Sequence, residues 1–472
     1  MIDLKDKDVL VIGLGRRGQA ACELLRRQGA RVMAVDPANT PALQEQAAAL
    51  RPMGIEVALG ASDLPKKTYS LAVVTPAVLP GERLLRAVSE RNVPLVGELE
   101  LGFQHAKCLA IGITGTNGKS TTAGLIEQLL LSNNRKTVLS GDPVRPVCSI
   151  ADQTRELDFL LLQVSASQLE HIEFFRPAVA VLLNIAPDHS DRYPTAEEYI
   201  RASGEIFKNQ QAFDWAIIQS EALSRLRELK VPIPGKIISF SASDPEADLH
   251  LDRGLIISRV GNWAGPLIDM DECRLRGPHN AENIMAALAV GHVLRLPIET
   301  MRDPIKTREA GPHRFQFVEE INGVQFIDDS KAANLDALRK ALLAARPAPQ
   351  NQPNIWLIAG GQEKNFEFHD LGPLLSRRVR KAFLLGEASE KLRAAWSLFT
   401  PCKVSGSLVE AVVEAAQNAD PGDVVLFSPA CSSFDQFLKS QNRGDEFCAA
   451  VKSISRGAEP GSPYGMGKSP EN

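Results

Sequence analysis

The stretch Gly112–Thr122, with the sequence GITGTNGKSTT, combines residue types that bind the phosphate groups of a nucleotide. It lies between a run typical of a buried strand and a run typical of an amphipathic helix. Gly115 and Gly118 allow tight backbone turns, so that successive N–H groups can point at phosphate oxygens. Lys119 adds a full positive charge to the partial charge of the helix N-terminus. The stretch therefore predicts a phosphate-binding loop, although a strict Walker pattern would require glycine in place of Ile113.

A second glycine-rich turn, Gly13–Gly18 (GLGRRG), also follows a strand-like run and precedes a helix-like run. Asp36 ends the next predicted strand. This pattern is typical of a nucleotide-binding crevice in which Asp36 accepts a hydrogen bond from a ribose or a base. Two other interpretations remain open: close packing of strand and helix without a ligand, and a dinucleotide-dependent dehydrogenase.

The elements that must hold these two turns alternate between strands and helices along the chain. Apolar, β-branched runs such as residues 31–36 and 424–430 predict strands, and the run 120–134 predicts a helix. The alternation predicts an α/β fold with mostly parallel sheets and right-handed crossovers. We place the predicted domains at residues 1–105, 106–309 and 310–456, followed by a tail at 457–472. The Gly, Pro and Ser content of the tail is typical of disorder.

The composition favours a globular protein that acts on small molecules. The 472 residues are 44% hydrophobic and 23% charged, with a formal net charge of −4. This charge gives no electrostatic reason to expect nucleic acid or an anionic membrane as a partner. The seven cysteines form no CxxC pair, which indicates a reducing compartment. With no signal-like start and no apolar run of about 20 residues, we expect a cytoplasmic protein. We also expect it to be a monomer.

Eight motifs, in order along nearly the whole chain, resemble those of the Mur ligase family. They are GITGTNGKST (112–121), SQLE (167–170), NIAPDHSDRY (184–193), GPHNAENIMAA (277–287), GPHRFQFV (311–318), DDSKAAN (328–334), GGQEKNFEF (360–368) and LFSPACSSFDQFLKSQNRGDEF (426–447). The resemblance implies three domains: a UDP-binding Rossmann-like domain, a central P-loop ATPase, and a Rossmann-like C-terminal domain that closes over ATP.

The same resemblance implies an amide-forming reaction with ATP and Mg²⁺ as cofactors. In its nearest branch, ATP phosphorylates the carboxylate of UDP-N-acetylmuramoyl-L-alanine, and the amino group of glutamate then displaces phosphate, as a step of peptidoglycan precursor synthesis. An anionic carboxylate must approach an anionic triphosphate, so Mg²⁺ and Lys119 must neutralise charge.

The resemblance and the two glycine turns assign roles to individual residues. The catalytic residues would be Lys119, His189 and Lys331. ATP would contact Gly115, Thr116, Asn117, Gly118, Lys119, Ser120, Thr121, Asn280, Asn283, Arg314 and Asp329. The substrates would contact Gly15, Arg17, Asp36, Lys364, Ser433 and Phe434. Mg²⁺ would bind Ser120, Gln163 and His189. Structural alternatives include an N-cap role for Asn280 and solvated surface positions for Arg314 and Lys331.

Some positions depart from the family pattern. Gln163 stands where the family usually has a metal-binding glutamate, and Ser203 where it has a carbamylated lysine, so we expect weaker metal binding. Glu205 should face away from the site of residue 203, because two residues differ by about 200° around a helix. Asp142 replaces a neutral amide and should repel the substrate's phosphates. Arg17 replaces a small hydroxyl residue and could bind a phosphate.

These departures leave two functions from different classes open. The protein could be a working ligase with altered metal dependence. It could instead be a ligase-fold protein that binds ATP or a UDP-sugar as a regulator or partner.

Overall fold

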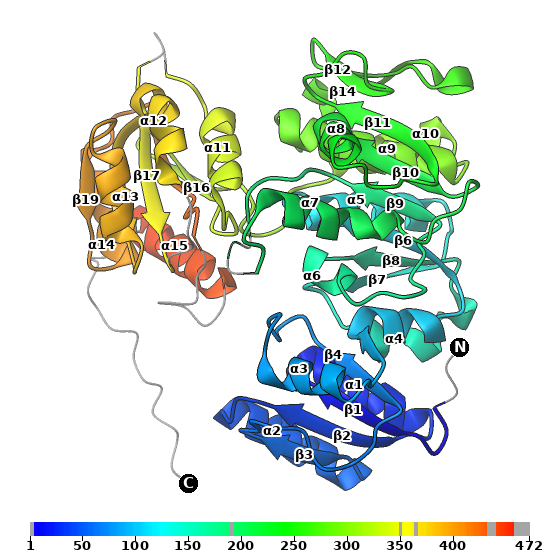
Figure 1. Ribbon diagram of the computed structural model, residues 1–472. Coiled ribbons are helices and arrows are strands. Elements are labelled where there is room, and N and C mark those ends of the chain that lie inside the picture. Colours follow the sequence, from blue (N-terminus) through cyan, green and yellow to red (C-terminus); the bar gives the residue numbers. More distant parts are fainter. Residues whose placement is uncertain are drawn as a thin grey trace, which may run out of the picture. The chain divides into compact units, whose positions relative to one another are not determined.

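The elements of this protein form three sheets in two compact units (Figure 1). The structure, a computed structural model, describes residues 4–188, 190, 192–348, 352–362, 367–431 and 440–456. Unit 1 comprises residues 1–186 and 192–308, and unit 2 comprises residues 187–191 and 309–472. The predicted α/β class is confirmed. Each predicted domain holds one sheet, but the first two sheets belong to the same unit.

The N-terminal sheet of unit 1 is parallel throughout, with the order β3-β2-β1-β4-β5. Its strands are β1 (Asp8–Ile12), β2 (Arg31–Asp36), β3 (Glu56–Leu59), β4 (Leu71–Val74) and β5 (Leu95–Gly97). Its helices are α1 (Arg16–Arg27), α2 (Pro41–Leu50), α3 (Arg83–Glu90) and α4 (Glu98–His105). The first glycine turn joins the carboxyl end of the central strand β1 to α1, which is where an open parallel sheet binds ligands.

The second sheet of unit 1 has the order β14-β13-β12-β11-β10-β9-β6-β8-β7, and only the pairs that involve β13 are antiparallel. Its strands are β6 (Leu109–Thr114), β7 (Thr137–Gly141), β8 (Phe159–Gln163), β9 (Val179–Leu182), β10 (Trp215–Gln219), β11 (Lys236–Ser241), β12 (Leu249–Asp252), β13 (Leu255–Ser258) and β14 (Gly265–Asp269). Its helices are α5 (Lys119–Ser132), α6 (Ala166–Leu169), α7 (Ala196–Gly204), α8 (Ser220–Glu228), α9 (Pro278–Val293) and α10 (Ile298–Thr307). The predicted phosphate loop follows β6, which lies between β9 and β8.

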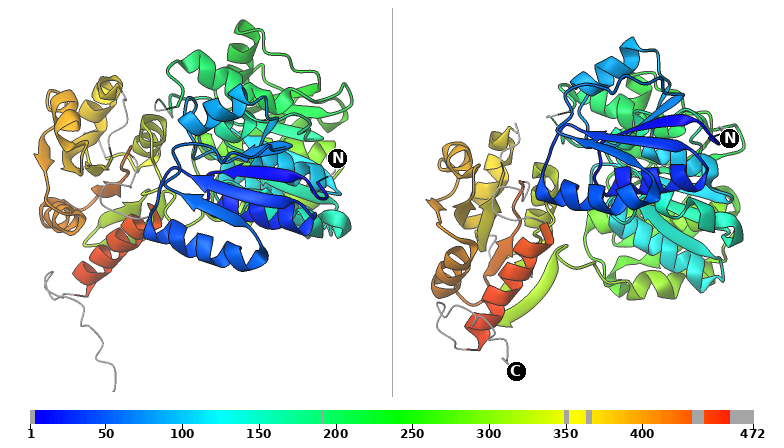
Figure 2. Two further views of the ribbon diagram at one scale, coloured as in Figure 1. Left: turned by 60° about the horizontal axis from the view of Figure 1, so that its bottom comes forward. Right: turned by 90° about the horizontal axis from the view of Figure 1, so that it is seen from below.

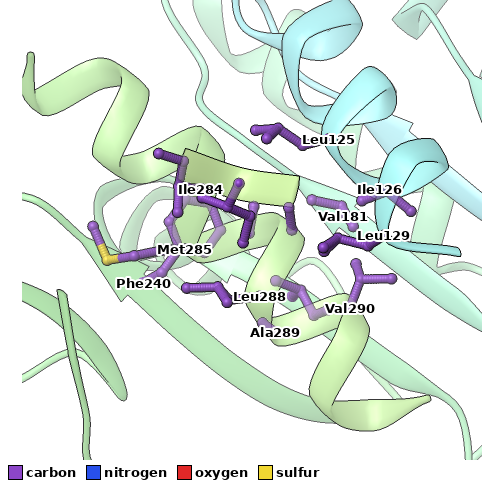
Figure 3. Packing of buried hydrophobic residues seen from close by; sticks show 14 of the residues in the cluster. Leu125, Ile126, Leu129, Val181, Phe240, Ile284, Met285, Leu288, Ala289 and Val290 are labelled. Carbon is purple, nitrogen blue, oxygen red and sulfur yellow. The ribbon is translucent and has the colours of Figure 1, made fainter. Parts of the chain in front are cut away.

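The helix that begins at the phosphate loop is fixed by apolar packing. Figure 3 shows Leu125, Ile126 and Leu129 of α5 in one cluster with Ile284 and Leu288 of α9. All five side chains are at most 1% exposed. Burying side chains of this size contributes about 1.5–3 kcal/mol each, so α5 is held firmly beneath the loop that it must position.

Unit 2 contains a sheet with the order β15-β16-β20-β17-β18-β19, in which only β15 is antiparallel. Its strands are β15 (Gln316–Ile321), β16 (Val324–Asp328), β17 (Ile355–Gly360), β18 (Val379–Leu385), β19 (Cys402–Val404) and β20 (Val424–Phe427). Its helices are α11 (Leu335–Ala344), α12 (Gly372–Arg378), α13 (Ser389–Trp396), α14 (Leu408–Asn418) and α15 (Ser440–Ser455). The red helix α15 lies alongside β15 in Figure 2. Among the described residues, no helix is long and apolar enough to span a bilayer.

Candidate functional site

The geometry of the predicted phosphate loop requires its two glycines. Gly115 and Gly118 have φ angles of 135° and 90°, which side chains disfavour. A Cβ atom at Gly118 would lie 2.4 Å from Oδ1 of Asn283, and one at Gly115 would lie 3.1 Å from the backbone of Asn184. The loop is therefore a tight turn between β6 and α5 with no room for side chains at these two positions.

Asn184 holds this loop, although no sequence-based prediction gave it a role. Its Oδ1 accepts a hydrogen bond from the N–H of Asn117 at 2.9 Å, and its Nδ2 donates to the carbonyl of Asn117 at 3.0 Å. Its own carbonyl accepts from the N–H of Thr116 at 3.0 Å. Because these two loop amides have partners, a phosphate would have to use other N–H groups, such as those of the first turn of α5. The only sequence signal for Asn184 was its place at the start of NIAPDHSDRY.

The hydroxyl of Thr116 also positions the loop. It donates to the carbonyl of Ala186 at 3.1 Å, accepts from the N–H of Ala186 at 2.9 Å, and lies 3.1 Å from the hydroxyl of Tyr199. The side chain of Thr116, a residue predicted to contact ATP, therefore faces the protein, and its contact with ATP remains a prediction.

The ammonium group of Lys119 folds back over the loop. Its Nζ donates to the carbonyls of Gly115 at 2.5 Å and Thr116 at 3.1 Å. This places a full positive charge beside the N-terminus of α5, where the helix dipole also attracts anions. The arrangement suits a nucleotide polyphosphate.

Two of the three predicted metal ligands lie together. The hydroxyl of Ser120 donates to Oε1 of Gln163 at 2.9 Å, and Gln163 is buried at the end of β8. A hydroxyl and an amide oxygen can both bind Mg²⁺, but neither is charged. The pair therefore fits a Mg²⁺ ion that is held largely by the phosphates of ATP. The third predicted ligand, His189, lies outside the described residues.

Glu205 does not place a negative charge next to Ser203, where the family has a metal-binding carbamylated lysine. Ser203 is buried near the end of α7, whereas Glu205 begins the next turn and pairs with Lys208 at 3.0 Å, with a side chain that is 40% exposed. Glu205 therefore points to solvent, which confirms the expectation from helical geometry.

Asn283 of α9 connects this helix to α5, and Asn280 supports Asn283. The hydroxyl of Thr122 donates to Oδ1 of Asn283 at 3.1 Å, and Nδ2 of Asn283 donates to Oδ1 of Asn280 at 3.1 Å. Nδ2 of Asn280 donates to the carbonyl of Arg276 at 2.8 Å. The N-cap of α9 is Gly277, so the alternative role of Asn280 as N-cap is wrong. Both asparagines were predicted to lie near adenine. In the structure Asn283 holds α9 against the helix of the phosphate loop, and Asn280 accepts a hydrogen bond from Asn283.

The first glycine turn combines close packing with one open position. A Cβ atom at Gly13 would lie 2.2 Å from Oγ1 of Thr75, and one at Gly18 would lie 1.9 Å from the carbonyl oxygen of Gly13. A Cβ atom at Gly15, the N-cap of α1, would meet nothing within 4 Å. A ligand can therefore approach the N-terminus of α1 at Gly15, while Gly13 and Gly18 serve the fold.

Asp36 is turned toward the protein. It is 8% exposed, and its two carboxylate oxygens accept hydrogen bonds from the N–H groups of Leu14 at 2.7 Å and Ala38 at 2.9 Å. Asp36 therefore fixes the glycine turn against the loop that follows β2. A depression of about 410 Å³ lies in the same domain and is lined by Asn39, Gln44, Arg51 and Leu59.

Arg17 and Asp142, two residues that differ from the family pattern, form an ion pair. Nη2 of Arg17 is 2.5 Å from Oδ1 of Asp142, and the two side chains are 25% and 36% exposed. Arg17 therefore compensates the negative charge of Asp142, and the expected repulsion of the substrate's phosphates stays a prediction. The sequence could not reveal this pairing, because Arg17 lies in α1 and Asp142 follows β7, far apart in the chain.

In unit 2, Arg314 and Lys331 lie at one end of a hairpin. Arg314 precedes β15 and Lys331 follows β16, and these strands pair antiparallel. Burial lowers the pKa of Arg314, and burial together with the charge of Arg314 lowers the pKa of Lys331. Within the described part of the chain, neither side chain forms a hydrogen bond or an ion pair. Two neighbouring cations that have no such partner among the described residues are suited to bind an anion.

The backbone around Arg314 is strained and braced. His313 and Phe315 have φ angles of 65° and 47°, which are unusual for residues with side chains. His313 Nδ1 lies 2.7 Å from Oδ2 of Asp328, and the N–H of Phe315 donates to Asp329 at 3.0 Å. These contacts hold the backbone on both sides of Arg314.

Arg443 also stabilises the backbone near Arg314 and Lys331, although nothing in the sequence indicated this role. Its guanidinium is buried and donates to the carbonyls of Ser330 at 2.9 Å and Cys431 at 3.0 Å. It therefore links α15 to the segment that carries Asp329 and Lys331. The predicted glutamate contacts Lys364, Ser433 and Phe434 lie outside the described residues, as does the tail.

Asp329 should make the stability of the protein depend on pH. Burial raises its pKa to about 7, although hydrogen bonds from Ser428 and Phe315 act in the opposite direction. An unfolded aspartate titrates near about 3.9, so the folded state binds this proton more tightly. The proton on Asp329 therefore stabilises the folded state. This contribution to the free energy of unfolding is complete below the pKa of the unfolded aspartate and is lost as pH rises through about 7.

We therefore expect the thermal midpoint of the wild type to fall between about pH 5.5 and 8, by about several degrees, and Asp329→Asn to reduce this fall. Calorimetric scans across this range test it. Asp370→Asn, at an exposed aspartate of unit 2, is the control and should follow the wild type. Parallel curves for the wild type and Asp329→Asn would contradict the assignment.

Comparisons with known proteins agree with the motifs. Two family models match: the Mur ligase middle domain over residues 113–291 and the Mur ligase, glutamate ligase domain over residues 313–431. UDP-N-acetylmuramoylalanine–D-glutamate ligase from Acidobacterium capsulatum is 37% identical over 450 residues, covering 94% of this chain and 96% of the relative. The enzyme of the same name from Pelobacter propionicus is 36% identical over 457 residues, covering 96% and 100%.

Solved structures share the fold at low sequence identity. MurF ligase from Thermotoga maritima in complex with ADP has a TM-score of 0.60 and 18% identity, covering 96% of each chain. UDP-N-acetylmuramate-alanine ligase MurC from the same organism has a TM-score of 0.59 and 17% identity, covering 95% of this chain and 100% of that chain. Both similarities confirm the predicted fold.

Proposed function

Because the chain belongs to the Mur ligase family, we propose that it is an ATP-dependent ligase that joins D-glutamate to UDP-N-acetylmuramoyl-L-alanine in peptidoglycan precursor synthesis. The observation that carries this proposal is the loop between β6 and α5, where Lys119 lies over a helix N-terminus and Ser120 meets Gln163. Relatives that are 33–37% identical over nearly their whole length are named as D-glutamate ligases. ATP and Mg²⁺ would be the cofactors.

The reaction needs two displacements. A carboxylate oxygen of the UDP-sugar attacks the γ-phosphorus of ATP, the bond from that phosphorus to the β,γ-bridging oxygen breaks, and ADP leaves. The amino nitrogen of glutamate then attacks the acyl carbon and loses a proton, the bond from that carbon to the phosphate oxygen breaks, and phosphate leaves. Lys119 stabilises negative charge on the transferred phosphoryl group. A bound Mg²⁺ supplies further neutralisation of charge.

The residues of unit 2 would serve the same chemistry. Arg314 and Lys331 are proposed to bind phosphate oxygens of ATP or of the acyl phosphate, and Asp329 to contact ATP. The partial burial of all three groups, and the lack of hydrogen-bond or ion-pair partners for the two cations among the described residues, support this role. Lys364, Ser433 and Phe434 are proposed to bind glutamate on the basis of the family motifs alone.

The N-terminal sheet would bind the UDP group. The open position at Gly15 suits a diphosphate at the N-terminus of α1, and the depression beside Asn39 and Arg51 suits a base or ribose. The predicted domain boundaries, monomeric state and small-molecule partners are retained as parts of this proposal.

Release of phosphate tests the function directly. Purified protein should release phosphate only when UDP-N-acetylmuramoyl-L-alanine, D-glutamate, ATP and Mg²⁺ are all present. Mass spectrometry should identify the amide product. If ATP binds but no product forms at any Mg²⁺ concentration, the protein is a ligase-fold protein that binds nucleotides as a regulator or partner and does not catalyse the reaction.

Restoring a carboxylate at residue 163 should strengthen binding of the metal. Gln163→Glu places a negative charge 2.9 Å from the hydroxyl of Ser120 if the side chain keeps its position. We expect the Mg²⁺ concentration for half-maximal rate to fall about three- to tenfold, because hard cations prefer carboxylates to amides. Titration of Mg²⁺ at saturating ATP measures this shift, with Gln153→Glu at an exposed position as the control.

A second change, Ser203→Lys, would restore the lysine of the family pattern, but the buried position of Ser203 makes a lysine difficult to accommodate. Ser203→Lys must place a long cationic side chain where Ser203 is 1% exposed, and its effect on folding must be measured alongside activity. An unchanged Mg²⁺ requirement in Gln163→Glu would mean that residue 163 does not contact the metal.

A further inference from the structure

Helix α1 is packed against the central part of unit 1 by an apolar core. Ala21 and Leu24 of α1 share one buried cluster with Cys148 and Ala151, which belong to the segment after β7. At the far end of α1, Arg27 forms an ion pair with Asp152 at 2.8 Å. These contacts fix α1 without the help of Arg17. The fold therefore does not depend on the ion pair of Arg17 with Asp142, so this pair is available for a role in ligand binding.

The position of this pair relates it to both glycine turns. Arg17 is the second residue of α1, close after the open position at Gly15. Asp142 follows the last residue of β7, and its N–H donates to the carbonyl of Gln163 at 2.8 Å. The side chain of Gln163 in turn accepts from Ser120 of the phosphate loop. The pair therefore lies between the proposed diphosphate site and the strand ends that carry the phosphate loop.

A second carboxylate lies within electrostatic reach of Arg17. Glu98 is 1% exposed, and its Oε1 accepts from the N–H of Cys148 at 2.8 Å. Among the described residues, none donates a hydrogen bond to its Oε2. Burial raises the pKa of Glu98, and the charge of Arg17 acts in the opposite direction. Removing Arg17 would leave Asp142 and Glu98 without this compensating charge.

We propose that Arg17 and Asp142 form a charge-compensated pair that sets the affinity of the protein for the diphosphate of its nucleotide-sugar substrate. Arg17 binds a phosphate oxygen with the N–H groups that do not face Asp142, and Asp142 fixes the plane of the guanidinium. An arginine has five N–H donors in a planar fork and can serve a carboxylate and a phosphate together. This inference rests on the proposed function and names a positioning device within that site.

If Arg17 and Asp142 act as a pair, the effects of Arg17→Ser and Asp142→Asn on the affinity for the nucleotide-sugar should not be additive. A partly exposed ion pair contributes little to folding stability, so its effect should appear in substrate affinity. In Arg17→Ser, Asp142 faces the diphosphate uncompensated and repels it. In Arg17→Ser with Asp142→Asn, that repulsion is gone. Asp142→Asn should therefore improve binding when it is added to Arg17→Ser, although it offers no gain in the wild type.

Isothermal calorimetry with UDP-N-acetylmuramoyl-L-alanine tests this expectation. We expect Arg17→Ser to raise Kd about tenfold or more and Asp142→Asn alone to change it less than about threefold. The double variant should bind at least about threefold more tightly than Arg17→Ser but stay weaker than the wild type, because the phosphate contact of Arg17 is still missing. The loss in Arg17→Ser should shrink at high salt, because the charges involved are partly exposed. Kd for ATP should stay within about twofold throughout.

The matched control uses the other ion pair of the same helix. Arg27→Ser, alone and with Asp152→Asn, removes the pair at the opposite end of α1, about 15 Å from Arg17. Neither control should change Kd for the nucleotide-sugar. Thermal midpoints of all variants show whether any of them misfolds.

Two results would overturn the inference. One is an unchanged Kd in a folded Arg17→Ser variant, which would show that Arg17 does not bind the substrate. The other is an equal loss in Arg17→Ser and in the double variant, which would show that the charge of Asp142 is not felt. If the wild type itself binds ATP but not the nucleotide-sugar, the proposed function fails together with this inference.

Discussion

Lys119→Ala should lower kcat/KM for ATP by about 10²–10³-fold, because it removes the cation aimed at the phosphates where charge develops in the transition state. In the structure its ammonium lies on the carbonyls of Gly115 and Thr116, at the N-terminus of α5. Phosphate release and ATP calorimetry measure the loss. The fold should survive, since α5 is held by its apolar face and not by Lys119.

A surface lysine of the same unit provides the control. Lys208→Ala removes a charge that pairs with Glu205 at the surface, and it should leave both ATP binding and turnover unchanged. Wild-type turnover in a folded Lys119→Ala variant would remove the basis for the phosphate-loop assignment and for the proposed ligase.

Arg314→Ala is the second change with a large expected effect, a loss of about 10²-fold in kcat/KM for ATP. Arg314 is a desolvated cation without a hydrogen-bond acceptor among the described residues, and it lies between two residues with positive φ. Such strain is stable only where the surrounding structure enforces it, and it is typical of sites that bind ligands. A steady-state ATP titration measures the loss.

The stability of this variant separates a functional role from a structural one. Removing a partly buried cation that has no ion-pair partner among the described residues should leave the thermal midpoint unchanged or raise it, while activity falls. Arg393→Ala, which removes a surface arginine paired with Glu390, should change neither quantity. A large drop in the midpoint of Arg314→Ala together with retained activity would show that Arg314 serves the fold.

The amino-acid sequence by itself determined the features that depend on neighbours in the chain. The phosphate loop at Gly115–Lys119 follows from glycines, a lysine and the change from strand to helix periodicity, and the structure places it between β6 and α5. The same local signals predicted the first glycine turn and the α/β class. The outward direction of Glu205, opposite to the buried Ser203, also followed from helical spacing.

The tertiary structure alone decided which side chains meet across these elements. Asn184 holds the phosphate loop from just beyond the end of β9, Asp36 turns inward to backbone amides, and Arg17 of α1 pairs with Asp142 beyond the end of β7. Periodicity reports which face of an element is buried, but not which residue of a distant element will lie opposite. Hydrogen bonds and ion pairs act over a few ångströms, so partners far apart in the chain become defined only when the sheets pack.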